Sequence, residues 1–345
     1  METIESLTEY IDLINKLNFA FYFNFKDINK ENEINSFIQN IDIDIKQNNR
    51  SAHEQAIAKI WEQILPRKED LFEYALSKRY VEAASISKFY FRGVSNTKHL
   101  NAPGIYRANL PKEKTENYFF NEIQVRCPAA FSGMKNINKL TYMQHYGCPT
   151  RLLDISSNPL VALYFACLGS ETTDGKVNIF GVLDDDILYE HSDRVQMLSK
   201  LAEFNASDQK QILILSYIHL LKEKFPQSST GKYVDNVIER FYHAIKRDNG
   251  AFEREIIPLD LLKPIFVQVN KDNPRILKQD GAFIMSGLDL SEEESNYKIN
   301  RFLTEQILIP SNVKQSLLKE LKRVCINQAS LFPEVDQVAS YLKNT

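Results

Sequence analysis

The chain has 345 residues, of which 43% are hydrophobic and 25% are charged, and its formal net charge is −3. The length suits two ordinary domains or one domain enlarged by insertions, and the composition is that of a globular protein with a large core. So small a net charge gives no global basic field that would attract nucleic acid or a membrane surface, and leaves only a local basic groove for nucleic acid.

The cysteines and the apolar segments predict a cytoplasmic protein. None of the four cysteines sits in a Cys-x-x-Cys pair, and their spacing suits neither a disulfide framework nor a zinc site, so we expect reduced thiols and no metal. The start, METIESLTEYIDLINKLNF, lacks the basic and apolar regions of a signal peptide. No apolar run approaches the roughly 18 residues of a membrane span, so no membrane partner is expected.

In chain order, the predicted elements change character at residue 88. Residues 1–87 form a helical N-terminal region, because apolar residues recur at helical spacing in segments such as AHEQAIAKIWEQIL. From residue 88 the chain turns to short strands, with TRLLDIS readable as a strand or as a tight loop. The other predicted strands are KFYFRG, KVNIFGVLDDD, KPIFVQVN, DGAFIMSG and NRFLTEQILIP.

Helices are predicted to interrupt these strands and to follow them. Two helical segments at about 195–250 read as an insertion into the sheet, and VKQSLLKELKRVCI and PEVDQVASYLKN read as two helices that end the chain. Helices, then an interrupted strand-rich core, then helices are typical of an α+β fold.

One segment, TYMQHYGCPTRLLDISSNPLVALYFAC at 141–167, is polar in its first half and apolar in its second. Asn158 and Pro159 predict a helix start there, since Asn can cap a helix and Pro suits its first position. The polar groups would then gather at the mouth of a strand-to-helix connection, where binding groups are often held. They are His145, Tyr146, Arg151, Asp154, Ser156 and Asn158. A structural interpretation stays open, in which Arg151 pairs with Asp154, and Ser156, Ser157 and Asn158 serve as caps.

A second polar cluster lies in NPRILKQDGAFIMSG. Arg275 and Gln279 precede Gly281 there, and the alternation of Gln279, Gly281 and Phe283 predicts a strand edge that faces a ligand. The alternative is a plain turn with Asp280 and Gly281 at its corner.

The third polar feature is a single residue, Arg92, at the end of the apolar strand FYFRG. An arginine in that position is costly to desolvate unless it meets an anion. The anion could be Asp154 or a phosphate group.

These segments resemble the FRG domain family. The similar stretches are FYFRG at 89–93, HYGCPTRLLDISSNPLVALYFAC at 145–167, PRILKQDGAF at 274–283 and INQASLFPEVDQVASYL at 326–342. The resemblance implies an FRG domain over 88–345 with a helical insertion at about 195–250.

A further resemblance is to the ADP-ribosyltransferase superfamily of the R-S-E type. Arg92 in its F-R-G sequence is similar to the first-strand arginine that contacts NAD in that superfamily, and DISSNPLVALYFA looks like its second NAD-contacting element. Gln279 stands where that superfamily carries a catalytic Glu, and a neutral amide cannot stabilise a ribosyl cation as a carboxylate can. The fold that this resemblance implies is a mixed β-sheet core of the ADP-ribosyltransferase type.

The activity implied is cleavage of the nicotinamide–ribose bond of NAD, with transfer of ADP-ribose to a macromolecular acceptor or to water. NAD is then a substrate, held without a Rossmann or P-loop sequence, since neither is present. The implied catalytic residues are Arg92, Asp154 and Gln279. The implied NAD-binding residues are Gly93, His145, Tyr146, Arg151, Ser156, Asn158, Tyr164 and Arg275. The acceptor, nucleic acid or protein, is left open.

Two other functions stay open. One is a non-catalytic nucleotide- or nucleic-acid-binding module, which the missing Glu favours; like the enzyme, it would suit a bacterial defence or toxin system. Its phosphate-binding arginines would be Arg92, Arg107, Arg126 and Arg151. The other is a hydrolase with His145 and Asp154 as a general acid–base pair, although no G-x-S-x-G sequence is present.

Overall fold

The structure is a computed structural model, and it describes residues 2–18, 33–34, 36–37, 40, 53–80, 85–107, 110–111, 113–169, 172–225, 236–253, 255–271 and 273–344. The strands are β1 (Glu2–Thr3), β2 (Lys88–Val94), β3 (Leu152–Ser156), β4 (Gly175–Val182), β5 (Ile187–Tyr189), β6 (Ile265–Gln268), β7 (Gly281–Met285) and β8 (Leu303–Ile309). Every strand predicted above is present. β1 and β5 were missed because two or three residues are too few to show an alternating pattern.

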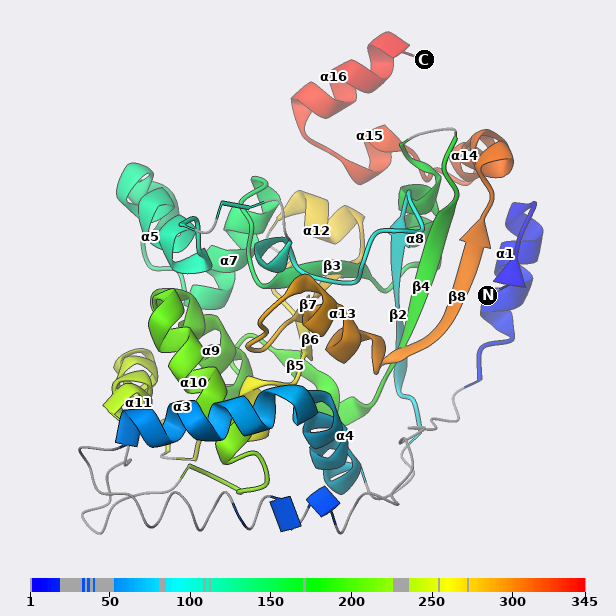
Figure 1. Ribbon diagram of the computed structural model, residues 1–345. Helices are drawn as coiled ribbons and strands as arrows, with labels where there is room; N and C mark the ends of the chain where they lie inside the picture. The colour runs from blue at the N-terminus through cyan, green and yellow to red at the C-terminus, as the bar shows by residue number, and fades with distance from the viewer. Residues whose placement is uncertain are drawn as a thin grey trace.

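The strands form one eight-stranded sheet in the order β1-β8-β4-β2-β3-β7-β6-β5. β1 pairs with β8 and β5 pairs with β6 in parallel, and the other neighbours are antiparallel. The prediction of helices around a mixed sheet is therefore confirmed (Figure 1).

The helices of the first half are α1 (Leu7–Asn15), α3 (His53–Ile64), α4 (Lys68–Arg79), α5 (Glu116–Arg126), α6 (Pro128–Phe131), α7 (Asn136–His145) and α8 (Pro159–Cys167). Those of the second half are α9 (Asp193–Lys200), α10 (Ala206–Ile218), α11 (Asn236–Asp248), α12 (Pro274–Lys278), α13 (Glu292–Asn300), α14 (Lys314–Arg323), α15 (Gln328–Leu331) and α16 (Val335–Asn344). Helices α9, α10 and α11 occupy the expected insertion. Across the described ranges, none of the helices combines the length and the hydropathy that crossing a bilayer requires.

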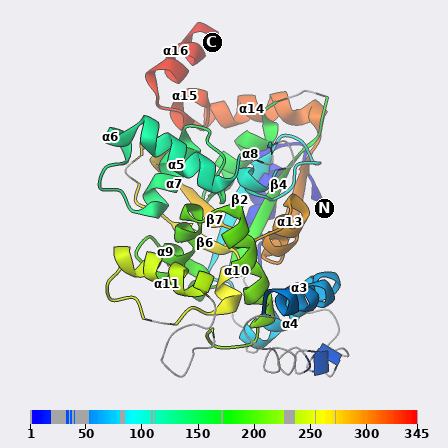
Figure 2. The same ribbon diagram turned by 60° about the vertical axis from the view of Figure 1, so that its left-hand side comes forward.

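Residues 1–87 were predicted to be helical, but the structure shows that this region is not wholly helical. Strand β1 adds an edge strand to the sheet through a parallel pairing with β8. Helix α1 follows β1 and packs beside α14, whereas α3 and α4 lie at the opposite end of the molecule (Figures 1 and 2). Most of residues 19–52 and all of 81–84 lie outside the described residues, so the helical prediction is not tested there.

Three apolar clusters hold the helices to the sheet. On β2, Phe89 and Phe91 point to one side and pack with α8, α14 and α1. On the same side of the other half of the sheet, Leu152 packs with α7 and the inserted helices. On the opposite side Tyr90 packs with Phe266, their ring centroids 5.8 Å apart. The alternation of partners along β2 and β3 is the expected result of the two-residue period of a strand.

Helix α8 lies unusually close to the sheet because two glycines face it. A Cβ at Gly93 of β2 would lie 1.7 Å from the carbonyl oxygen of Ala162, and one at Gly175 of β4 would lie 2.2 Å from that of Ala166. No other residue type fits such a backbone-to-backbone approach. The two glycines therefore set the position of α8, whose first turn borders the site described next.

Candidate functional site

The sheet splits between β2 and β3. Only one residue pair, Phe91 with Ser156, joins these two strands. Beyond that pair β2 remains bonded to β4 on its other edge, and β3 remains bonded to β7. Because the strands diverge, side chains from both of their faces reach the space between them.

A cavity of about 270 Å³ fills this split, and we call it the Arg92 pocket. Its lining residues are Phe91, Arg92, Gly93, Arg107, Thr141, Gln144, His145, Leu153, Asp154, Ile155, Ser156, Val161, Ala162, Phe165, Arg275, Ile276, Gln279 and Phe283. The three polar clusters singled out in the sequence, which are Arg92, the 145–158 segment and Gln279, thus meet at one place. Their roles stay predictions.

Arg92 is held by an amide and not by a carboxylate. Its Nη1 donates a hydrogen bond of 3.1 Å to Oδ1 of Asn101, which is 2% exposed. No Asp or Glu of the described residues lies within ion-pair distance of the guanidinium, so the pair with Asp154, one of the two alternatives considered for Arg92, is not formed. A guanidinium has five N–H groups in a rigid fork, and most of them are left for another partner.

Asn101 is itself fixed by other amides. Its Oδ1 also accepts from Nδ2 of Asn178, its Nδ2 donates to Oδ1 of Asn300, and its backbone N–H donates to Oδ1 of Asn296. Gln306 of β8 in turn donates to Asn178. Nothing in the sequence pattern pointed to this network, since its members come from β4, β8, α13 and a loop. It orients Arg92 without neutralising it.

We expect Asn101→Asp to weaken binding of inorganic pyrophosphate about tenfold or more. The new carboxylate would pair with Arg92 and repel an incoming anion, and a lost charge-assisted hydrogen bond is worth roughly 1.5–3 kcal/mol. Asn121→Asp, which adds the same charge on the exposed side of α5, is the control. Isothermal titration calorimetry measures both, and equal affinities for the two variants would contradict the role given to Asn101.

The pocket is rich in positive charge. Burial in the split and the charge of Arg107 lower the pKa of Arg92 to about 10, an effect that Asp154 opposes. Burial and the charge of Arg92 also lower the pKa of Lys176. Positive charges that lower one another's pKa in this way are stabilised when an anion binds between them.

Asp154 is the one carboxylate among the described residues that line the pocket. It is exposed, and it accepts a hydrogen bond of 2.8 Å from Nε2 of Gln144, whose Oε1 accepts one from Thr150. The chain Thr150–Gln144–Asp154 fixes the direction of the carboxylate. Gln144 was not singled out from the sequence.

Gln279 does not lie on a strand, so the predicted alternation with Gly281 and Phe283 is wrong for this residue. It ends helix α12, and Asp280 follows in a left-handed turn with φ 47° before β7 begins. The alternative of a turn at Asp280 and Gly281 is therefore the correct one. Nε2 of Gln279 donates a hydrogen bond of 3.0 Å to the carbonyl oxygen of Leu331. The Oε1 atom of Gln279 is left as an acceptor.

Ser156 and Asn158 hold this turn in place. The hydroxyl of Ser156 donates 2.7 Å to the carbonyl of Gln279 and accepts from the N–H of Asn158. Asn158 caps α8 by accepting from the N–H of Leu160, as predicted, and its Nδ2 donates to Asp280. Both side chains therefore have structural partners, and only Ser156 also lines the pocket.

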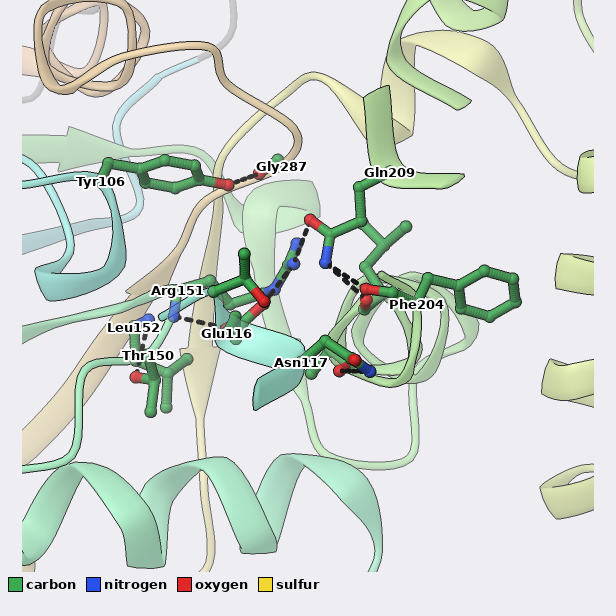
Figure 3. Close-up of polar contacts among 12 residues, drawn as sticks. Tyr106, Glu116, Asn117, Thr150, Arg151, Leu152, Phe204, Gln209 and Gly287 are labelled. Atoms are coloured by element: carbon green, nitrogen blue, oxygen red, sulfur yellow. Dashed lines mark hydrogen bonds and ion pairs between the residues drawn. The ribbon is translucent and has the colours of Figure 1, made fainter. Parts of the chain in front are cut away.

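Arg151 does not reach the pocket, which corrects its assignment to NAD binding. Its side chain is 1% exposed and forms a buried ion pair with Glu116 of α5, to which its Nε donates over 2.8 Å (Figure 3). The suggested pair of Arg151 with Asp154 is absent for the same reason. Arg126, proposed as a phosphate ligand, lies outside the pocket in an exposed pair with Glu122.

The two tyrosines assigned to NAD binding are also placed elsewhere. Tyr164 is buried in the cluster beneath α8, and Tyr146 is 65% exposed and lines a neighbouring cavity. The aromatic rings that do line the Arg92 pocket are those of Phe91, Phe165 and Phe283.

The segment 331–334 contacts three residues that line the pocket, which are Gln279, Arg275 and His145. The Phe332 ring lies 4.5 Å from the guanidinium of Arg275, and Glu334 lies 3.7 Å from Nε2 of His145. Burial and Arg275 lower the pKa of His145 against the effect of Glu334, so the imidazole is neutral at pH 7. The resemblance at 326–342 singled out this segment in the sequence, but not its contacts.

Comparison with known proteins places one family on this region. Residues 87–175 match the family model described as FRG domain. The match includes β2, β3 and α8, and it ends before Arg275 and Gln279. No curated protein and no solved structure matches the chain.

Proposed function

We propose, for a chain whose residues 87–175 form an FRG domain, that the Arg92 pocket binds the phosphates of NAD and that the protein transfers ADP-ribose from it. The observation that carries this proposal is the state of Arg92. Its guanidinium is half-buried, is oriented by the neutral Asn101, and has no carboxylate within ion-pair distance among the described residues. A desolvated arginine with free donors is suited to a phosphate.

The remaining lining supports cleavage of the nicotinamide–ribose bond. That bond breaks through a cation on the ribose, which a fixed carboxylate stabilises. Asp154, held by Gln144, is the group that would do so. Phe91, Phe165 and Phe283 offer apolar faces for the nicotinamide ring, and Oε1 of Gln279 offers an acceptor for a ribose hydroxyl.

One observation favours a second function, that of a non-catalytic nucleotide-binding module. The cavity of about 270 Å³ lies below the usual range of roughly 300–1,000 Å³ for pockets of drug-sized ligands. It would hold one half of a dinucleotide, or a mononucleotide as a whole. Binding without turnover is the outcome that this function requires.

Calorimetric titration with NAD tests whether Arg92 binds a phosphate of NAD. We expect Arg92→Lys to lose about tenfold or more in affinity, because lysine keeps the charge but cannot form a bidentate contact. Arg126→Lys, at an exposed position outside the pocket, should bind as the wild type does. A thermal melt of the same samples should show little change for either variant.

Nicotinamide release separates the enzyme from the binding module. Asp154→Asn should bind NAD but release nicotinamide at least about a hundredfold more slowly, in the range found when one transition-state contact is removed. Wild-type protein that binds NAD without releasing nicotinamide would establish the binding module. Wild-type protein that does not bind NAD would overturn the proposal.

A further inference from the structure

A second, larger cavity adjoins the Arg92 pocket. Its volume is about 640 Å³, and Thr141, His145 and Ile276 line both cavities. We call it the Tyr146 groove and define it by Asn138, Tyr142, His145, Tyr146, Ile276 and Glu334. A molecule in the groove would meet one in the Arg92 pocket at His145.

The two cavities differ in charge. Arg92, Arg107 and Arg275 line the pocket, whereas no Lys or Arg is among the described residues that line the groove. The one carboxylate there is Glu334, and His145 is neutral because its pKa is lowered. Nucleic acid is bound through Lys and Arg contacts to its phosphates. The groove lacks them, which disfavours a nucleic acid.

The groove offers two features that attract a cation. The first is an aromatic face: the ring of Tyr146 is 65% exposed, and the ring of Tyr142 lies 4.8 Å from it. Such faces bind guanidinium and ammonium groups. The second is Glu334, whose Oε2 is buried without a hydrogen-bond donor among the described residues. Buried polar atoms nearly always have hydrogen-bond partners. Oε2 of Glu334 has none among the described residues, so a donor from a bound ligand would satisfy it.

We propose that the Tyr146 groove binds a cationic side chain, arginine or lysine, of a peptide that serves as the acceptor of ADP-ribose. The acceptor role rests on the proposed function, whereas the binding does not. In the transfer, a nitrogen of that side chain forms a bond to C1′ of the ribose while the bond from C1′ to nicotinamide breaks. Nicotinamide leaves with the bonding electron pair, and His145 takes the proton that the acceptor nitrogen loses.

Calorimetric titration without NAD tests the groove by itself. The probes are the peptides acetyl-Gly-Gly-X-Gly-Gly-amide with Arg, Lys or Gln at X, and a single-stranded oligonucleotide. We expect the Arg or the Lys peptide to bind at least about tenfold more tightly than the Gln peptide. Glu334→Gln should remove most of that preference. Asp336→Asn, the same change two residues further on at an exposed position outside the groove, should retain it.

Failure of the groove and failure of the proposed function give different results. If the cationic peptides bind no better than the Gln peptide while NAD is cleaved, the groove proposal is wrong and the function stands. If the cationic peptides bind with the predicted dependence on Glu334 while NAD does not bind, the groove is confirmed as a binding site for cationic side chains. Its role in holding an acceptor of ADP-ribose is then wrong. Oligonucleotide binding that Tyr146→Ala abolishes would overturn the peptide proposal in favour of nucleic acid.

Discussion

Arg151→Ala is expected to lower the free energy of unfolding by about 3–5 kcal/mol, the usual cost of removing one partner from a buried ion pair. Arg151 and Glu116 are 1% and 3% exposed. Without the guanidinium, the Glu116 carboxylate would keep only the backbone N–H of residue 151 as a donor from that position. Urea unfolding followed by circular dichroism measures the loss.

The cost is large because Arg151 joins three elements. It directly precedes β3, pairs with Glu116 of α5, and its Nη2 lies 3.4 Å from Oε1 of Gln209 of α10 (Figure 3). Gln209 also donates to the carbonyls of Leu201 and Phe204. The inserted helices are thereby connected to the strand that carries Asp154.

Two further variants make this prediction specific. Arg126→Ala removes one partner of a pair that is 74% and 42% exposed, and should cost less than about 1 kcal/mol. The double variant Arg151→Met with Glu116→Leu should recover part of the loss, since an apolar pair leaves no buried charge. Equal losses for Arg151→Ala and Arg126→Ala would show that burial of the pair does not matter.

Gly93→Ala is expected to destabilise the protein by about 3 kcal/mol or more, at the upper end of the range for overpacking. The added Cβ would meet the carbonyl oxygen of Ala162 at 1.7 Å, and backbone atoms cannot rotate away as a side chain does. Since α8 or β2 must move apart to admit the methyl group, the Arg92 pocket should widen and its affinity for pyrophosphate should fall as well.

Gly250→Ala is the matched control, because nothing lies within 4 Å of a Cβ at that position. It should be neutral, or stabilising by about 0.4–1 kcal/mol through reduced freedom of the unfolded chain. Chemical denaturation of the two variants gives the comparison. A stable Gly93→Ala protein with unchanged anion binding would contradict the close packing of α8 on β2.

The sequence by itself determined the strands from β2 onward, with the exception of β5, and the start of α8. These features follow from local rules. An apolar run alternates on a strand, and Asn158 with Pro159 begins a helix because a cap and a fixed φ act within a few residues. The resemblance of residues 89–93 and 145–167 to FRG motifs indicated in addition that these distant segments act together. Their convergence on one pocket was predicted from that resemblance, but not from the residues alone.

Only the tertiary structure decided what each polar residue does. Arg92 and Arg151 both stand beside an apolar strand in the sequence, yet one meets the neutral Asn101 and the other meets the buried Glu116. The partners that make this difference come from remote segments, and no local pattern encodes them. The same holds for Gln279, which is directed by the carbonyl of Leu331. Residue type sets what a side chain can bind, and the partners that the fold brings to it decide what it binds.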